Sequence, residues 1–157
     1  MLFETILFAT DFSETSARAM DYVRRLKDAG CREVVLLHVI DQREAHVLLA
    51  EPAGFAAAEG EYEAELLGMM RKNAEAKLDE VRRWLEDAGL SVKAHLIDGI
   101  PATEIVRVAD AEHTSLIVVG SHGRSNITQF LLGSVSENVI RHANQPVLVV
   151  RRIEGGQ

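Results

Sequence analysis

The sequence predicts an α/β protein, a doubly wound open sheet of five parallel strands with four helices. Apolar runs rich in branched residues recur along the chain, and stretches of helical period separate them. The run Val34–Leu37 is apolar at consecutive positions, as in strands that are buried on both faces rather than on one. Together, these patterns indicate parallel strands covered by helices on both sides.

The first strand is predicted at Thr5–Ala9, and Thr10-Asp11 ends it. Ser13 is a good N-cap for the helix that follows, and Gly30 is a good terminator. The predicted apolar face of this helix includes Ala19, Met20, Val23 and Leu26.

The second strand is predicted at Glu33–Val39. Residues 41–62 show no sustained period, so a mobile connection is expected there. A long amphipathic helix then extends to Gly89, with Leu66, Met70, Ala74, Leu78, Val81 and Leu85 on its apolar face.

The last three strands are predicted at Ser91–Leu96, at Leu116–Val119 running into Gly120, and at Val147–Val150. Pro101 begins a helix that ends near His113, and Pro146 halts the final helix. We expect one domain over residues 1–152 and a frayed tail over 153–157.

Composition narrows the class of protein. A chain of 157 residues with 47% hydrophobic content suits one globular domain. Its 24 acidic and 17 basic residues give a net charge of −7, which predicts no nucleic-acid and no membrane partner. Cys31 is the single cysteine and no apolar run reaches membrane-spanning length, so a cytoplasmic location is expected.

Ligands of open α/β sheets bind beyond the carboxyl ends of strands, where strand order reverses. Three such ends stand out here: 9–11, 37–39 and 119–120. The third opens a segment, 120–136, that has no carboxylate and only Arg124 as a full charge. Its glycines, hydroxyls and backbone amides suit phosphate oxygens, so an anion site is predicted.

Ser134 has a second interpretation. Ser134 to Glu137 matches a capping box, in which the hydroxyl caps the helix and Glu137 returns to the Ser134 amide. The two roles are compatible, because a capped helix still presents amides and its positive dipole end to an anion. The spacings of the P-loop and of the dinucleotide-binding glycine motif are absent.

The spacing Gly120-x-x-Gly123, nine residues, then Gly133-Ser134 resembles the nucleotide-binding signature of the ATP-binding branch of the universal stress protein family. Nearly the whole chain shares the resemblance, including the segments 6–13, 37–39, 99–101 and 144–150. It implies a Rossmann-like sheet of order 3-2-1-4-5 and a homodimer. In that order Val147–Val150 is a strongly apolar edge strand that must be covered, so the dimer is predicted to form through it.

The resemblance also implies bound ATP. Asp11 would lie near the ribose and phosphates, the Val39 backbone would meet adenine, and Gly99 and Pro101 would flank the ribose. Asp11 is also the only evident acid that could hold Mg²⁺ or Mn²⁺ with the nucleotide, so such an ion is expected there. The remaining candidates, around or near the phosphates, are Ala9, Thr10, Gly120, Ser121, His122, Gly123, Arg124, Gly133, Ser134 and Val135.

Three functions remain open. The first is an ATP-binding regulatory module with slow or no hydrolysis. The second is a slow ATPase, or an enzyme that phosphorylates itself at Ser121, Ser125 or Thr128. The third is a nucleotide-free dimeric scaffold. We favour the first, because the loop offers donors for phosphate but no evident base to align water, and no catalytic residue is assigned. The downstream partner is not predicted.

Overall fold

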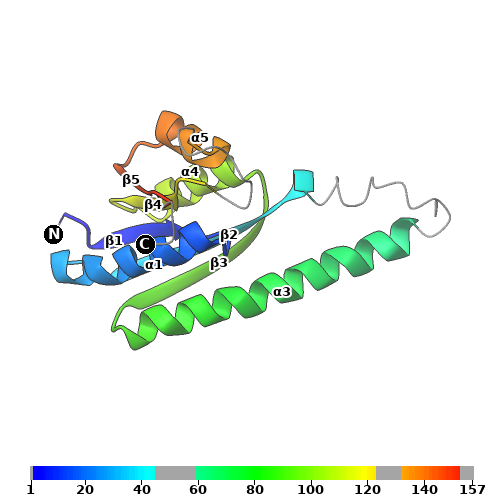
Figure 1. Ribbon diagram of the computed structural model, residues 1–157, viewed down its shortest axis with the longest axis horizontal. Helices are drawn as coiled ribbons and strands as arrows, with labels where there is room; N and C mark the ends of the chain where they lie inside the picture. The colour runs from blue at the N-terminus through cyan, green and yellow to red at the C-terminus, as the bar shows by residue number, and fades with distance from the viewer. Residues whose placement is uncertain (1, 45–58, 123–131, 153–157) are drawn as a thin grey trace.

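The computed structural model describes residues 2–44, 59–122 and 132–152. Its sheet has the order β3-β2-β1-β4-β5, and every neighbouring pair is parallel (Figure 1). The predicted fold class and the implied order 3-2-1-4-5 are therefore confirmed. The strands are β1 (Thr5–Ala9), β2 (Glu33–Asp41), β3 (Ser91–Gly99), β4 (Ile117–Gly120) and β5 (Val147–Val150).

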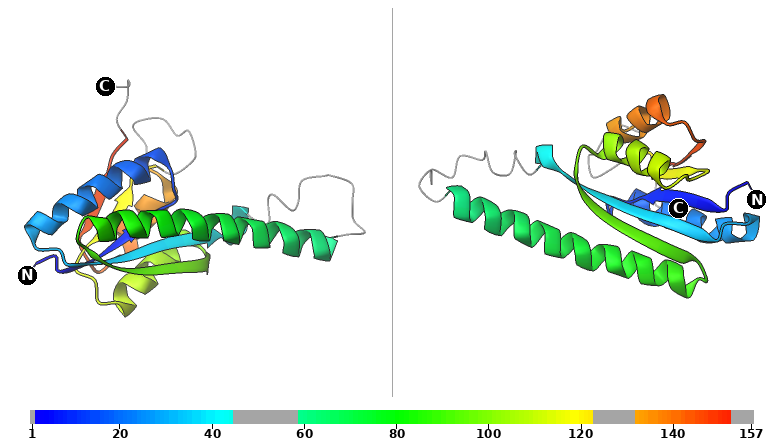
Figure 2. Two further views of the ribbon diagram at one scale, coloured as in Figure 1. Left: turned by 90° about the horizontal axis from the view of Figure 1, so that it is seen from below. Right: turned by 180° about the vertical axis from the view of Figure 1, so that it is seen from behind.

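The four predicted helices cover the sheet on both faces. They are α1 (Glu14–Leu26), α3 (Glu59–Asp87), α4 (Pro101–Ala111) and α5 (Ser134–His142), and a 3-10 turn, η1 (Lys27–Ala29), extends α1. Helices α1 and α3 pack on one face of the sheet, and α4 and α5 pack on the other (Figure 2). No helix in the described ranges is long and apolar enough to cross a membrane.

The alternation of side chains along β1 explains why the strand is apolar throughout. Ile6 and Phe8 face the layer of α1 and α3, whereas Leu7 faces the layer of α4 and α5. All three side chains are fully buried. A central strand with helices on both sides has no face toward water, which is the physical reason for the continuous apolar run.

The predicted ends of α1 are confirmed with one refinement. The Ser13 hydroxyl accepts from the Ser16 amide at 3.2 Å, as an N-cap does. Gly30 has φ +102° and ends the 3-10 turn η1 that follows α1, rather than α1 itself. Gly89, after α3, has φ +91°, so it too takes the left-handed conformation that glycine allows.

Three predicted boundaries differ from the structure. Strands β2 and β3 run further than expected, to Asp41 and Gly99, because they pair with each other beyond the last residue of β1. Helix α3 begins at Glu59, before the predicted end of the connection at residue 62. Its first turns are exposed, so they carry no burial period that a sequence pattern could detect. Residues 45–58 and the tail 153–157 lie outside the described residues.

We expect the Cys31 thiol to be unreactive in the native protein. The residue is 2% exposed, and burial raises the pKa of the thiol from 9.0 to about 11. Burial of the neutral thiol contributes to the stability of the folded protein fully below pH 9. This contribution is lost as the pH rises toward 11, because the Cys31 thiol of the unfolded chain ionises at a lower pH than that of the folded chain. Labelling with a disulfide reagent at pH 8 should be slow in buffer and fast in guanidinium chloride. Equal rates would contradict the assignment.

Candidate functional site

A cavity of about 320 Å³ lies at the carboxyl ends of β1, β2 and β4, where the chain order reverses between β1 and β4. This is the place that the open-sheet rule predicts, and the volume falls within the range of small-molecule sites. The lining includes these predicted residues: Ala9, Thr10, Asp11, Val39, Pro101, Gly120, His122, Gly133, Ser134 and Val135. Gly99 and Ser121 do not line it, and Gly123 and Arg124 lie outside the described residues.

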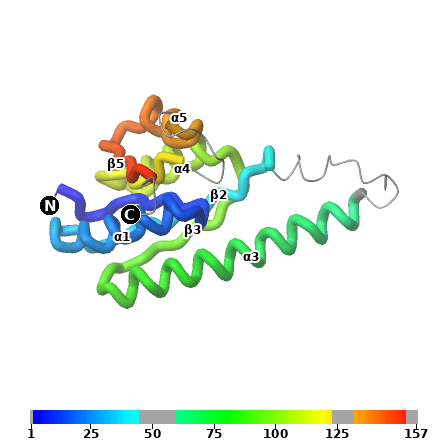
Figure 3. Tube along the Cα trace, viewed as in Figure 1, coloured from blue at the N-terminus to red at the C-terminus, as the bar shows by residue number. Residues whose placement is uncertain are grey.

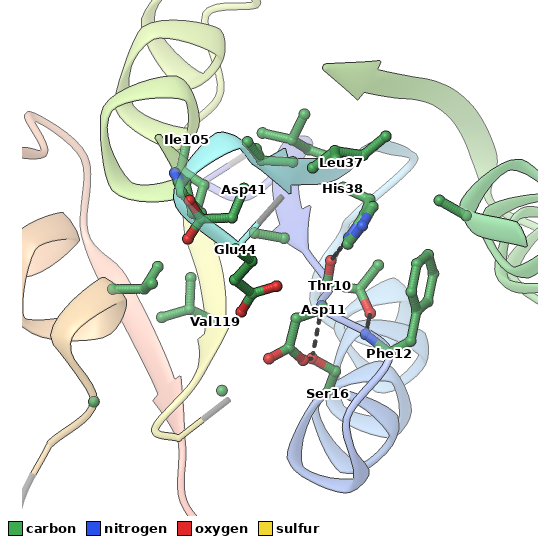
Figure 4. Close-up of a pocket in the computed structure, with 18 of the residues that line it drawn as sticks. Thr10, Asp11, Phe12, Ser16, Leu37, His38, Asp41, Glu44, Ile105 and Val119 are labelled. Carbon is green, nitrogen blue, oxygen red and sulfur yellow. Dashed lines mark hydrogen bonds between the residues drawn. The ribbon is translucent and has the colours of Figure 1, made fainter. Parts of the chain in front are cut away.

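Asp11 lies at the base of the cavity and is fixed by hydrogen bonds (Figure 4). Its Oδ1 accepts from Ser16 Oγ at 2.7 Å and from the Ser13 amide at 3.0 Å. The residue therefore shapes the turn before α1 and also presents its carboxylate to the cavity. Both roles that the sequence allows are compatible with this geometry.

Phe12, which follows Asp11, has an unusual backbone. Its φ is +63°, which is strained for an aromatic residue. The Phe12 amide donates to Thr10 Oγ1 at 3.1 Å, and the ring stacks near His38 with centroids 4.4 Å apart. His38 in turn places Nδ1 2.7 Å from the Thr10 carbonyl oxygen. These contacts hold the strained turn in place, and sequence analysis had not singled out Phe12 or His38.

The backbone of Val39 faces the cavity for a geometric reason. The Leu37 carbonyl accepts from the Thr10 amide at 2.9 Å, so the peptide groups of Leu37 point toward β1. Backbone groups alternate along a strand, and Val39 therefore directs its N–H and C=O to the same side, beyond the end of β1. A donor and an acceptor side by side suit the edge of a planar nucleobase.

The amino end of α5 forms the opposite wall. The capping box predicted at Ser134 is wrong, because Gly133 is the N-cap and no side chain caps the helix. Glu137 pairs with Arg141 at 2.8 Å instead of returning to an amide. Ser136 Oγ donates to the Gly120 carbonyl, so it ties the helix to the end of β4. The first turn of α5 thus borders the cavity with its positive dipole end.

Gly133 is required by packing. A Cβ at this position would lie 2.8 Å from the Ser121 carbonyl oxygen, and the Gly133 amide donates to that oxygen at 2.7 Å. Ser121 is 1% exposed and also donates its amide to the Val150 carbonyl at 2.8 Å. Ser121 is therefore a structural junction between β4, β5 and the approach to α5.

Gly120 and Gly99 are also restricted by neighbouring side chains. A Cβ on Gly120 would approach Thr15 Cγ2 to 2.9 Å, so the glycine lets α1 pack against the end of β4. A Cβ on Gly99 would meet Glu104 Cγ at 2.8 Å. Pro101 is the first residue of α4, as predicted.

Two walls of the cavity were not predicted. Helix α3 contributes Met70, Asn73, Ala74 and Lys77. The last residue of β2, Asp41, and the following Arg43 and Glu44 form the other wall. The α3 residues follow the spacing i, i+3, i+4, i+7, so they form one stripe along the helix. That spacing is visible in the sequence, but it does not reveal that the stripe reaches the ends of β1 and β2.

These two walls make the cavity more acidic than the sequence predicts. The sequence segment 120–136 has no carboxylate, yet the folded cavity is lined by Asp11, Asp41 and Glu44. Arg43 pairs with Asp41 at 3.1 Å, and this carboxylate raises the pKa of the guanidinium. Across the described residues, no three histidine, cysteine or acidic side chains are grouped to hold a metal ion.

The comparisons with known proteins are consistent with this geometry. The universal stress protein family matches residues 2–151. The universal stress protein MJ0577 of Methanocaldococcus jannaschii is 43% identical over 157 residues, which cover 97% of each chain. The solved structure of the MJ0577 protein superposes with a TM-score of 0.84 at 41% identity, covering 99% of this chain and 100% of that one.

A second solved structure contains a ligand. It is a universal stress protein in complex with cAMP, with a TM-score of 0.63 at 25% identity, and the match covers 95% of this chain and 97% of that one. The family match spans almost the entire chain, and the near full-length identity to a curated member supports it. This chain belongs to the universal stress protein family.

Proposed function

We propose that the protein is an ATP-binding regulatory module whose state depends on nucleotide occupancy. One observation carries the proposal: a single cavity at the strand-order reversal collects the Asp11 carboxylate, the Val39 backbone and the first turn of α5. The cAMP complex of a related protein supports an adenine nucleotide as the ligand class.

The residues present fit such a ligand in three parts. The Val39 amide and carbonyl would pair with the adenine edge, and Asp11 would contact the ribose. The amides at Ser134 and Val135 would receive phosphate oxygens at a helix amino end. Mg²⁺ or Mn²⁺, when bound, would neutralise phosphate charge, and Asp11 is the residue that would hold it.

We further propose that turnover is slow or absent. Efficient phosphoryl transfer requires an aligned nucleophile as well as charge neutralisation. Asp11 Oδ1 already accepts two hydrogen bonds, and His122 Nδ1 lies 2.9 Å from Ser121 Oγ inside the buried junction. Ser121 is 1% exposed, which disfavours it as a phosphate acceptor. Ser125 and Thr128 lie outside the described residues.

The proposed dimer uses the β5 edge. Strands β3 and β5 are the two edges of the sheet. The β3 edge carries the exposed Lys93, whose Nζ lies 2.6 Å from Glu112, and such charges protect an edge against pairing. The β5 edge consists of Val147–Val150, with three of its residues only partly buried. A second copy would cover these apolar side chains.

The protein is expected to bind ATP and to turn it over slowly. Mass spectrometry of small molecules released from the purified protein should detect an adenine nucleotide. Calorimetry should then show ATP binding that strengthens with Mg²⁺ or Mn²⁺. A single-turnover assay should release phosphate far more slowly than the roughly 1–10³ s⁻¹ of typical enzymes. Release near one per second would make the protein an ATPase, and stable label on the chain would indicate self-phosphorylation.

A further inference from the structure

Lys77 is a cation that only the folded chain brings to the cavity. It belongs to α3, whereas the predicted phosphate segment follows β4 some forty residues later in the chain. Lys77 nevertheless lines the same cavity as Asp11, Gly133 and Ser134. Lys77 therefore places a positive charge on the α3 side of the cavity.

The described lining contains two lysine or arginine side chains, and their charges are engaged differently. Arg43 is paired with Asp41 at 3.1 Å. Lys77 makes no ion pair with any of the described residues, in contrast to Arg71, Arg82 and Arg83 of the same helix, which all do. Among the described residues, Arg43 therefore has a carboxylate partner at the cavity, whereas Lys77 has none.

The position of the Lys77 ammonium is favoured by an aromatic ring. Nζ lies 5.7 Å from the centroid of the Phe12 ring, within the range of a cation–π contact. Phe12 itself is fixed by its hydrogen bond to Thr10 and by the adjacent His38 ring (Figure 4). The ring therefore gives the long lysine side chain a preferred location beside the turn that carries Asp11.

The acidic lining of the cavity makes a nearby cation favourable for anion binding, and Lys77 can supply it. Three carboxylates, those of Asp11, Asp41 and Glu44, line the cavity, so a bound anion would lie close to negative charge. Like charges disfavour one another at short range, so a polyphosphate requires compensating cations in this cavity. The amino end of α5 supplies only a partial charge.

We propose that Lys77 is a specificity-determining residue that favours phosphorylated over unphosphorylated ligands in this cavity. The inference rests on the proposed nucleotide function and deepens it by assigning a charge-recognition role to α3. The expected signature is a loss of affinity that grows with ligand charge, because a cation contributes little to the binding of neutral adenosine.

The test compares Lys77→Gln, Lys77→Arg and Lys72→Gln in the full-length chain. Lys72 is the matched control, because it is an exposed lysine of the same helix that does not line the cavity. Calorimetry would measure ATP, AMP and adenosine with each protein at low and at high salt. Since Lys77 is also exposed, the glutamine variant should keep the wild-type thermal stability.

Lys77→Gln is expected to weaken ATP binding by about three- to tenfold, the range of one charge-assisted contact at a partly exposed site. The loss should shrink at high salt and should be near zero for adenosine. Lys77→Arg should restore most of the affinity, and Lys72→Gln should bind like wild type. Unchanged ATP affinity, or an equal loss for adenosine, would overturn the assignment of Lys77 alone. A wild-type protein that binds no ATP would overturn the proposed function and, with it, this inference.

Discussion

Gly133→Ala is expected to weaken ATP binding by roughly tenfold or more, the effect of losing one or two charge-assisted hydrogen bonds. The added Cβ would lie 2.8 Å from the Ser121 carbonyl oxygen, which is backbone and cannot rotate away. The start of α5 must therefore shift, and it would carry the amides of Ser134 and Val135 away from the phosphates. Overpacking of this kind should also cost about 1–3 kcal/mol, or roughly 3–10 °C in Tm.

Gly68→Ala is the matched control for this substitution. Gly68 lies on α3 and a Cβ there would meet nothing within 4 Å. Alanine should raise stability by about 0.5–1 kcal/mol, because glycine is a poor residue in a helix interior. Calorimetry with ATP and thermal unfolding would be measured for both variants. Wild-type ATP affinity in a folded Gly133→Ala protein would refute the phosphate role of the α5 amino end.

Val149→Pro is expected to convert the proposed homodimer into a monomer. The Val150 carbonyl accepts from the Ser121 amide, and the Pro146 carbonyl accepts from the Ile117 amide, so both point toward β4. Backbone groups alternate along a strand, so the N–H of Val149 lies on the outer edge of β5. Proline removes this donor while leaving the β4 pairing intact, as edge strands allow. A symmetric strand pair would lose a hydrogen bond twice, once for each copy.

Ala94→Pro provides the control on the opposite edge. The Ser91 amide donates to Arg32 on the β2 side, so the N–H of Ala94 faces outward from β3. Light scattering at micromolar concentration should give the mass of two chains for wild type and Ala94→Pro, and of one chain for Val149→Pro. Far-ultraviolet circular dichroism would check that each variant is folded. A wild-type mass of one chain, or a dimer lost only with Ala94→Pro, would reject the β5 interface.

Local sequence patterns predict the structure best where the pattern and the burial coincide. The run Thr5–Ala9 forms β1 with the predicted limits, since a central strand is apolar on both faces. Ser13 caps α1, and Pro101 begins α4, because both ends depend on local backbone chemistry. The strand order was predicted from the family resemblance of the motifs, which occur in the same order along the chain. Hydrophobic periodicity carries no information about strand order.

A local sequence signal predicts the wrong structure where it is compatible with two arrangements of the chain. The segment from Ser134 to Glu137 satisfies the capping-box pattern, but the fold uses the preceding Gly133 as N-cap. Ser121 decides between them, because its carbonyl holds the Gly133 amide and fixes where the helix starts. The first turn of α3 is not predicted, because residues 60–62 are exposed and the turn therefore shows no burial period.

The layers of the fold and the position of the cavity at the carboxyl ends of the strands follow from sequence patterns, and ten of the 25 lining residues are among the predicted site residues. The charge of the cavity and its α3 wall depend on how distant segments pack together. Lys77 reaches the cavity because α3 packs along β3 and β2 (Figure 3). Asp41 lines the cavity because β2 extends beyond the last residue of β1. The helical period shows which face of a helix is buried. It does not show which strands that face contacts or at which point along them. The partners of a side chain depend on contacts between segments that are distant in the chain, which no local pattern records.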